Sequence, residues 1–465
     1  MPRRSPSRPR PRRATRSRSR RLSLHRPPHS PVVLVTSYSL VLARAAAAPA
    51  GRVRRRRRAM LLSAACALLG AAAAGAQQPA PSAGTPAAAS PPPDSVAAPL
   101  PEPRARERSV GRRLDVHGYL AQGAALSRGG QVYGIPNDGT VDLRRAAVLG
   151  SYRLGQDDRV VAQLAHRRVG EAPRARMLPE VKLDWLFWEH GFGDATRLRV
   201  GRFPIPYGIF AETRYVGTLL PFFQAPASFY RESEFTNEAL DGASLGHELF
   251  ATSAFPLELT AYVGGLDYVE SLSLPLGPQG AWRYVTAPAA ARRVAGVQAW
   301  LGTPVPGLRV GGGFAQGQIR GGVRPAGQRD TLHGWYASVD GSFERFTARA
   351  ELIGFDMQQY RARAGYVQLG VRPARRLWLN AQAERTLGTL RGLPLPPTYA
   401  PGSIRLDHLR DLGASAVWSV PGVRSMQLRA EAHRSRGYHV EADDIAATAP
   451  ARRGRQFLVG VATAF

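Results

Sequence analysis

The chain has 465 residues and a formal net charge of +29, with 63 basic residues against 34 acidic ones. Taken alone, this excess would favour a nucleic-acid-binding protein. However, 18 of the basic residues, all arginines, lie in residues 1–60, a segment without any acidic residue. The rest of the chain carries a net charge of only +11, so its composition does not indicate a nucleic-acid partner.

Residues 54–76 have the three parts of a secretory signal peptide. Five consecutive arginines at 54–58 precede a short apolar run, and Ala-Gly-Ala at 74–76 places cleavage before Gln77. The apolar run is too short for a membrane-spanning helix. An Ala-rich low-complexity stretch is the alternative interpretation. The signal predicts export, which in a Gram-negative cell can lead to the outer membrane.

Two segments around the signal have no structural pattern. Residues 1–53 form an Arg-rich, disordered extension, and we interpret it as a translation start assigned too far upstream, with Val53 as the natural start. A basic arm that binds nucleic acid is the rival interpretation, which a cleaved signal would remove. The only cysteine, Cys66, leaves with the signal. Residues 77–113, rich in Pro, Ala and Ser, are predicted to be a periplasmic linker.

From residue 114 to residue 465 the dominant pattern is alternation with a period of two. Apolar and polar residues alternate over 345–352, 377–384 and 425–434, which indicates strands with one apolar and one polar face. About sixteen such strands of roughly ten residues can be placed, and that length allows a tilted strand to cross a bilayer. A soluble sandwich shows the same alternation, so the connections must decide between the two.

The predicted connections alternate in length. Short turns are expected at 155–158, 191–195, 253–256, 303–307, 341–344, 372–375 and 419–422. Longer loops are expected at 128–142, 169–179, 204–239, 267–291, 319–330, 356–361, 388–405 and 436–454. Short turns on one side and long loops on the other are typical of outer-membrane barrels. We therefore predict an all-β fold, a transmembrane antiparallel β-barrel of about sixteen strands over residues 114–465.

Aromatic residues near the predicted strand ends suit girdles at the two membrane interfaces, although each could equally be a core aromatic. They are Trp185, Trp188, Trp300, Trp335, Trp378, Trp418 and Phe465.

The third long connection is rich in aromatic and aliphatic residues, unlike a hydrophilic external loop. Tyr207, Phe210, Phe222, Phe223 and Tyr230 require burial, and lipid cannot accept irregular backbone. We therefore expect this loop to fold into the barrel and to narrow the pore.

Two short motifs carry a family resemblance. LRVGRFPIPYGIFAETR resembles a segment of outer-membrane porins of the phosphate-selective type and their less characterised relatives, and the end QFLVGVATAF resembles the signature by which the barrel-assembly machinery recognises its clients, here through Phe465. The resemblance implies a passive porin, no cofactor and a homotrimer. Phosphate-selective porins line their path with lysine and arginine, whereas this chain has a single lysine, Lys182.

Alternation and loop position predict the charged residues of the pore. A charge facing lipid at mid-membrane costs about 2–4 kcal/mol, so charged strand residues should point into a water-filled lumen. The predicted pore-lining residues are Lys182, Arg197, Arg199, Arg202, Arg349 and Arg429. The predicted constriction-loop residues are Glu212, Arg214, Arg231, Glu232, Glu234 and Glu238. Opposed charges of this kind orient solutes and bias ion passage, here towards anions; the alternative is that several of them only keep the loop mouths wet.

Catalytic motifs are weak in this sequence. Residues 242–246 match Gly-x-Ser-x-Gly, but that motif works only between a strand and a helix, whereas here it lies within one predicted strand. His433 and Ser435 share a strand face, as in outer-membrane phospholipases, without an evident third member. The histidines show no metal-binding spacing. We therefore predict a non-enzymatic, metal-free porin, with a structural or adhesive barrel and a lipid hydrolase as the alternatives.

Overall fold

The computed structural model describes residues 113–129, 134–170, 179–214, 216–230, 239–275, 282–322, 329–358, 360–391, 403–423, 425–437 and 452–465. The predicted extension at 1–53, the signal peptide at 54–76 and the linker up to residue 112 lie outside these residues.

Sixteen antiparallel strands form one closed barrel, which confirms the predicted fold class. Each strand pairs with its neighbours in the sequence, and β1 pairs with β16, as shown by Tyr119 opposite Ala464. The strands are β1 (Leu114–Arg128), β2 (Thr140–Arg153), β3 (Asp158–Val169), β4 (Val181–Phe192), β5 (Thr196–Pro204), β6 (Ala239–Leu249), β7 (Leu257–Pro275), β8 (Trp282–Gly302), β9 (Leu308–Gly321), β10 (Arg329–Ser342), β11 (Phe346–Asp356), β12 (Tyr360–Ala374), β13 (Leu377–Arg391), β14 (Ser403–Ser419), β15 (Gln427–Gly437) and β16 (Arg452–Ala464).

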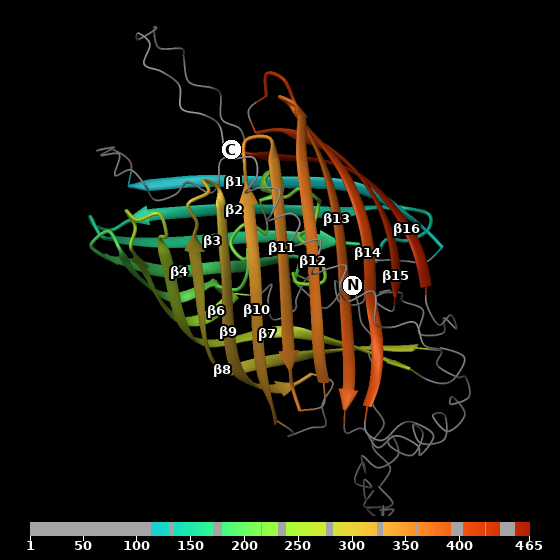
Figure 1. Ribbon diagram of the computed structural model, residues 1–465, viewed down its shortest axis with the longest axis horizontal. Coiled ribbons are helices and arrows are strands. Elements are labelled where there is room, and N and C mark those ends of the chain that lie inside the picture. Colours follow the sequence, from blue (N-terminus) through green and yellow to red (C-terminus); the bar gives the residue numbers. More distant parts are fainter. Residues whose placement is uncertain are drawn as a thin grey trace, which may run out of the picture.

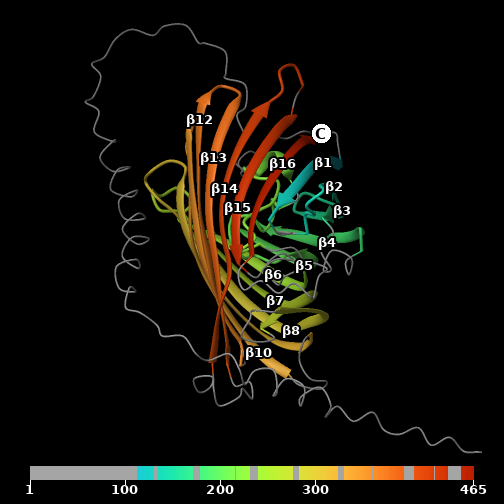
Figure 2. The ribbon, with the colours of Figure 1, turned by 90° about the vertical axis from the view of Figure 1, so that its right-hand side faces the viewer.

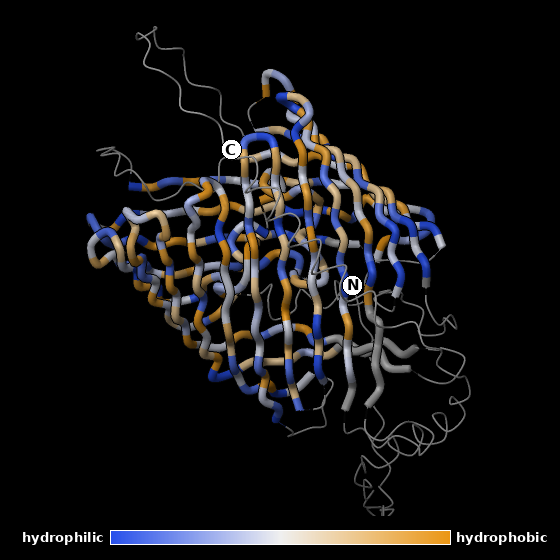
Figure 3. The backbone as a smooth tube through the Cα atoms, in the orientation of Figure 1, coloured by the Kyte–Doolittle hydropathy of each residue, from blue (hydrophilic) through white to orange (hydrophobic). Residues whose placement is uncertain are grey.

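The two faces of the barrel wall differ as the alternation predicts. On β16, Phe457 and Val459 are 47% and 60% exposed, whereas Leu458 between them is 7% exposed. On β11 the outward Leu352 is 60% exposed and the neighbouring Glu351 is 1% exposed. Hydrophobic and hydrophilic residues therefore alternate along the strands in Figure 3. An apolar outer surface around a polar interior is the arrangement of a transmembrane barrel.

The connections follow the predicted alternation in length only in part. Seven turns of two to seven residues lie on the side that holds the free ends of β1 and β16. On the other side five connections have eleven or more residues, whereas 276–281, 322–328 and 357–359 have six, seven and three, so these three are shorter than predicted. The predicted loop 267–291 was wrong in extent, because β7 continues to Pro275 and β8 begins at Trp282. Asp267 to Pro275 pair with Ala290 to Trp282 through backbone hydrogen bonds, which do not require an alternating sequence. This hairpin extends well beyond its neighbours at the right of Figure 1.

The predicted aromatic girdle is correct only in part. Trp335, Trp418 and Phe465 are exposed on the outer surface, at 38%, 40% and 76%. Trp185 and Trp300 are instead 8% and 7% exposed and belong to the interior. Strand-end position alone therefore did not tell which face an aromatic side chain occupies.

Figures 1 and 2 view the barrel from two directions. In Figure 1 the strands on one side, including β11 to β14, cross those on the other side, including β1 to β4, because the strands of a barrel tilt against its axis. The connection between β5 and β6 lies between the two walls in both views. The predicted inward loop is thus present.

The outer face generates a prediction about stability. Val459→Arg places a charge in the middle of the outward face of β16, and we expect it to lower the free energy of unfolding by about 2–4 kcal/mol. Thr463→Arg, on the same face but close to the end of the strand, is the matched control and should cost about 0–1 kcal/mol. Denaturant unfolding in lipid vesicles measures both values. Equal losses at the two positions would contradict a membrane-embedded outer face.

Candidate functional site

The candidate site is the barrel interior, and the loop between β5 and β6 is its main feature. Residues 205–214 and 216–230 leave the wall after Pro204 and run inside the barrel, with the short 3-10 helix η2 (Gly217–Leu219) midway. Ile205, Tyr207 and Phe222 are at most 2% exposed. The apolar side chains that made an external loop implausible are therefore buried against the inner wall.

Part of the inner wall is apolar where the loop rests on it. The ring of Tyr207 lies 4.4 Å from the ring of Tyr336 on β10, measured between centroids. Phe210 contacts the ring of Tyr366 on β12, and Ile353 on β11 belongs to the same buried cluster. This contact surface positions the loop in a defined place on β10 to β12.

Glu351 on β11 is the most densely hydrogen-bonded contact between wall and loop. Its Oε1 accepts hydrogen bonds from the backbone N–H of Ile209 (3.0 Å) and from the Ser338 hydroxyl (2.5 Å). Its Oε2 accepts hydrogen bonds from the hydroxyls of Tyr230 (2.5 Å) and Tyr366 (2.6 Å). A buried carboxylate with four donors is well satisfied, and it ties both ends of the described loop to the wall.

Gly208 shows how closely the loop approaches this carboxylate. Its φ is +87°, a conformation that favours glycine. A Cβ atom at this position would lie 2.1 Å from the Tyr230 hydroxyl oxygen and 2.9 Å from Oε1 of Glu351. Glycine at position 208 therefore meets two requirements, because it allows the positive φ and leaves room for the Tyr230 hydroxyl and the Glu351 carboxylate.

Further wall residues hold the loop backbone from β13, β14 and β15. Glu431 accepts a hydrogen bond from the N–H of Phe223 (2.5 Å), and Glu384 accepts one from the N–H of Ser228 (2.7 Å). Arg429 donates to the carbonyl oxygens of Gly217 (2.8 Å) and Leu220 (2.5 Å). Ser415 donates to the carbonyl of Pro221 (2.7 Å). The irregular backbone is thus supplied with partners by the wall, as burial requires.

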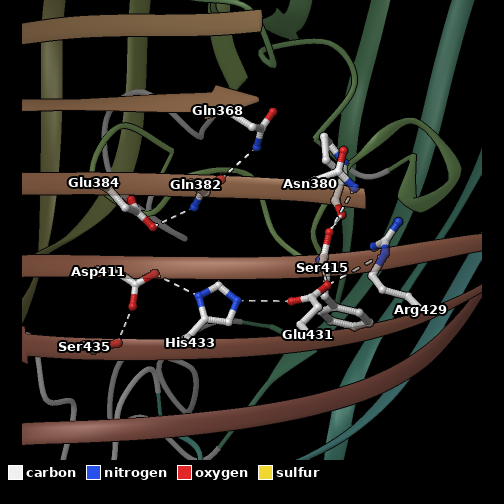
Figure 4. A network of polar contacts seen from close by, with 12 residues as sticks. Gln368, Asn380, Gln382, Glu384, Asp411, Ser415, Arg429, Glu431, His433 and Ser435 are labelled. Carbon is white, nitrogen blue, oxygen red and sulfur yellow. Dashed lines mark hydrogen bonds and ion pairs between the residues drawn. The ribbon is translucent and has the colours of Figure 1, made fainter. Parts of the chain in front are cut away.

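These wall residues belong to a buried polar network on β12 to β15, shown in Figure 4. Gln382 links Gln368 (2.7 Å) to Glu384 (2.9 Å), and Asn380 donates to Ser415 (3.0 Å). Alternation placed most of these side chains on the polar face. It did not indicate that they contact the loop.

The same network contains Ser435, His433 and Asp411, the three residue types of a hydrolase triad. Ser435 donates its hydroxyl hydrogen to Asp411 and not to His433. The two ring nitrogens of His433 lie 2.8 Å from Asp411 and 3.4 Å from Glu431. In this arrangement the histidine is not placed to take a proton from Ser435, which a nucleophilic mechanism needs. Ser244 of the Gly-x-Ser-x-Gly match lies inside β6, as expected from its sequence context.

A basic sector occupies the inner wall on β2 to β4. Arg145 and Arg167 are 4% and 5% exposed, and Lys182 lies 3.0 Å from the fully buried Asp184. The loop residue Arg214, only 2% exposed, lies 3.4 Å from the same carboxylate and donates to the carbonyl of Ala211. Asp184 lies at an irregularity in the pairing of β3 with β4, so the period-two alternation did not predict that its side chain faces inward.

The predicted pore-lining bases, with one exception, lie on the inner face and mostly have acidic partners. Arg199 contacts Glu189 and the predicted loop residue Glu212, each at 2.8 Å. Arg349 contacts Asp340 at 2.9 Å and stacks over the ring of Phe210. The other predicted bases on the inner face are Lys182, Arg197 and Arg429. Arg197 lies on the same strand face as Arg199. Arg231, Glu232, Glu234 and Glu238 lie outside the described residues.

Arg202 is the exception, and its prediction as a pore-lining residue was wrong. It makes a two-pronged contact of 2.8 Å with Asp241, which is 55% exposed, and it lies opposite the outward-facing Leu186. It is three residues from Arg199, so alternation puts the two arginines on opposite faces. An ion pair on the outer surface takes the place of a lumen contact.

Other kinds of site are not evident in the part of the chain that the structure describes. No group of three or more His, Cys, Asp or Glu side chains could hold a metal ion there. No helix among the described residues has the length and apolarity needed to cross a membrane.

Comparison with known proteins gives a likeness in structure only. No protein-family model matches the chain, and no curated protein matches it. Solved structures similar to it include Salmonella typhi OmpF in complex with daunomycin (TM-score 0.49, 11% identity, covering 76% of this chain and 97% of that one). The outer membrane channel DcaP of Acinetobacter baumannii (0.47, 8%, 76% and 97%) and an anion-selective porin from Comamonas acidovorans (0.46, 10%, 76% and 99%) are also similar. At this level of similarity, function has to follow from this chain's own residues.

The carboxylate contact generates a prediction about loop position. Glu351→Gln replaces one carboxylate oxygen by an NH2 group, which cannot accept the hydrogen bonds that this oxygen received. We expect the free energy that holds the loop on the wall to fall by roughly 1–3 kcal/mol. The measurement is the rate of tryptic cutting after the buried Arg214, which should rise. Glu212→Gln is the matched control, because Glu212 is a half-exposed loop acid with one described partner. Unchanged cutting in Glu351→Gln would contradict the anchoring role.

The close approach at Gly208 generates a second prediction. Gly208→Ala should cost roughly 1–3 kcal/mol of unfolding free energy, because the added methyl group meets Tyr230 and Glu351 in a strained backbone conformation. Gly150→Ala is the control, since a Cβ at Gly150 meets no atom within 4 Å. Denaturant unfolding in detergent micelles compares the two variants. An equal loss of unfolding free energy in Gly150→Ala and Gly208→Ala would contradict the explanation by close packing at Gly208.

Proposed function

We propose that this barrel is an outer-membrane porin through which small hydrophilic solutes diffuse passively. The observation that carries the proposal is the inverted polarity of the wall, with buried charged side chains inside and apolar residues outside. A buried charge is costly unless it is paired or reaches water, and the inward side chains of Arg199 and Arg349 are still 23% and 17% exposed, as expected beside a water-filled space. A polar lumen crossed by one inward loop suits a narrow aqueous passage.

The proposal includes a weak preference for anions, with phosphate as one candidate solute. On β2 to β4, the inner face and the loop together present five basic side chains against two carboxylates, Asp184 and Glu189; the basic residues are Arg145, Arg159, Arg167, Lys182 and Arg214. On β13 to β15, by contrast, Glu384, Asp411 and Glu431 outnumber the basic side chains. Two sectors of opposite sign create a field across the lumen. Because the two sectors offset one another, the expected selectivity is weak.

The cellular context of the porin is part of the proposal. The signal at 54–76 would export the chain, and the outward aromatic Phe465 at the end of β16 would be read by the barrel-assembly machinery. A homotrimer, which the resemblance to porins implies, remains a proposal as well. None of these steps requires a metal or a cofactor.

A barrel with a closed lumen and a structural or adhesive role is the second candidate. The observation in its favour is the number of wall strands that hold the loop, since β2, β11, β13, β14 and β15 all hydrogen-bond to its backbone. A loop held so firmly could seal the barrel instead of narrowing it. Conductance separates the two candidates.

The porin proposal predicts discrete single-channel openings of the purified full chain in planar bilayers. No openings under any voltage would contradict it and favour the closed barrel. We expect the reversal potential under a KCl gradient to show a weak anion preference. The double variant Arg145→Gln/Arg167→Gln should shift this potential towards cations, because it removes two inward positive charges. Arg202→Gln is the control, since Arg202 faces outward and should leave the potential unchanged. A cation-selective wild-type channel would contradict the anion preference.

A further inference from the structure

Polar side chains of both signs gather on the inner wall at the short-turn end of β5 to β7. Arg197 on β5, Gly246 on β6 and Thr260 on β7 lie opposite one another in the strand pairing. Two residues further along β6 and β7, Glu248 and Glu258 lie opposite each other. We refer to these five residues as the β5–β7 cluster. It lies near the strand ends, where the lumen opens on the short-turn side.

Strand alternation places the two carboxylates of the cluster in the lumen. On β6, Ser244 is 5% exposed and belongs to the interior, whereas Leu245 is 47% exposed on the outer face. Glu248 is four residues from Ser244 and therefore shares its face. On β7, Glu258 is likewise four residues from Tyr262, which is 2% exposed. Both carboxylates thus face the interior of the barrel and not the lipid.

Glycines leave open space on both sides of Arg197. A Cβ atom at Gly246 would have the Thr260 hydroxyl oxygen as its nearest neighbour, at 3.6 Å. A Cβ atom at Gly191, which lies opposite Arg197 on β4, would meet two backbone oxygens at 3.6 and 3.8 Å. Neither glycine has a positive φ, so the backbone does not require glycine at these positions. Their missing side chains leave room on the wall for part of a solute.

The polar side chains around this space have no partner among the residues that the structure describes. Arg197, Glu248, Glu258 and Thr260 make no side-chain hydrogen bond and no ion pair there. Electrostatic interaction still links Glu258 with Arg197 and with Glu248, so the three charges lie close together. A guanidinium, two carboxylates and a hydroxyl are therefore available to a solute in the lumen.

Charged side chains on the neighbouring inner wall are paired within the chain. The ion pairs are those of Arg199 with Glu189 and Glu212, and those of Arg309 and Arg349 with Asp340. Arg309, whose charge also acts on Glu258, is thus already engaged by a carboxylate. The β5–β7 cluster differs from these neighbours because its charges are left for a group from outside the chain.

The cluster matches a solute that carries an ammonium group and a carboxylate close together. A guanidinium binds a carboxylate through two parallel hydrogen bonds, and a carboxylate binds an ammonium group. Arg197 is the diagonal neighbour of Glu248 on the next strand, a position in which Cβ atoms lie about 7 Å apart. Like charges directly opposite destabilise a sheet, so an ammonium group between Glu248 and Glu258 would also relieve their repulsion.

We propose that the β5–β7 cluster binds zwitterionic amino acids in the lumen, with their ammonium group at Glu248 and Glu258 and their carboxylate at Arg197. This inference rests on the proposed porin function, because the solute has to reach the lumen. It names a class of solute that local contacts select in a channel with only a weak overall charge preference. Binding should be weak, since a site in a conducting channel must also release its solute.

The test measures solute binding to the full chain in detergent micelles by saturation-transfer NMR. The probe is L-alanine, compared with propionate, which lacks the ammonium group, and with ethylamine, which lacks the carboxylate. We expect wild type to bind L-alanine at least about tenfold more tightly than either analogue, because each analogue loses a hydrogen bond between charged groups.

Three variants separate the parts of the cluster. Arg197→Gln removes the guanidinium, and Glu248→Gln/Glu258→Gln removes both carboxylate charges; each should weaken L-alanine binding at least about tenfold. Gly246→Val fills the open space while every charge is kept, and it should cause a loss of similar size. Glu344→Gln is the matched control and should bind like wild type, because Glu344 is an exposed acid in the short turn between β10 and β11.

Several outcomes would overturn the inference. They are binding of either analogue as tight as that of L-alanine, unchanged L-alanine binding in Arg197→Gln, in the double variant or in Gly246→Val, and an equal loss in Glu344→Gln. Folding is verified by heat-modifiable electrophoretic mobility. Glu258→Gln alone replaces the double variant if that does not fold.

Conductance distinguishes a failure of this inference from a failure of the proposed function. A channel that opens but binds L-alanine no better than its analogues would contradict the amino-acid site alone. A wild type without openings that still binds L-alanine selectively would contradict the porin proposal alone.

Discussion

Backbone hydrogen bonding in the membrane is the constraint on which this structure depends. Lipid offers no partner to a peptide N–H or C=O, so every strand must be paired on both sides. Pairing of β1 with β16 meets this requirement and leaves no free edge. Closure in turn assigns every second residue to the lipid and every other one to the interior, which gives each strand its alternating sequence.

The same constraint applies to the irregular chain inside the barrel. The loop between β5 and β6 has no ladder to satisfy its backbone, and the inner wall supplies the missing partners. Glu351, Glu384 and Glu431 accept loop N–H groups, whereas Arg429 donates to loop carbonyls. Inner-wall charges therefore serve two purposes, because the groups that make the lumen polar also hold the loop that narrows it.

Arginine has different roles on the two surfaces of the wall. Inside, Arg199 and Arg349 are matched with carboxylates and lie against aromatic rings of the interior. Outside, Arg202 pairs with Asp241 near the loop-side boundary, and Arg361 and Arg363 pair with Asp356. At these positions the positive charge of arginine is therefore balanced by acidic side chains on both faces of the wall.

Alternation and connection length are local properties, so the sequence by itself determined the barrel, its sixteen strands, the sides of its turns and the inward loop. The same alternation also assigns Arg202 and Arg199, three residues apart, to opposite faces of the wall. Only the tertiary structure decided which inner residues meet the loop, because Ile209 and Glu351 are 142 residues apart in the chain. It also decided the inward position of Asp184 at a strand irregularity and the length of the β7–β8 hairpin. Contacts across the lumen and backbone pairing without a side-chain pattern leave no periodic signal in a sequence.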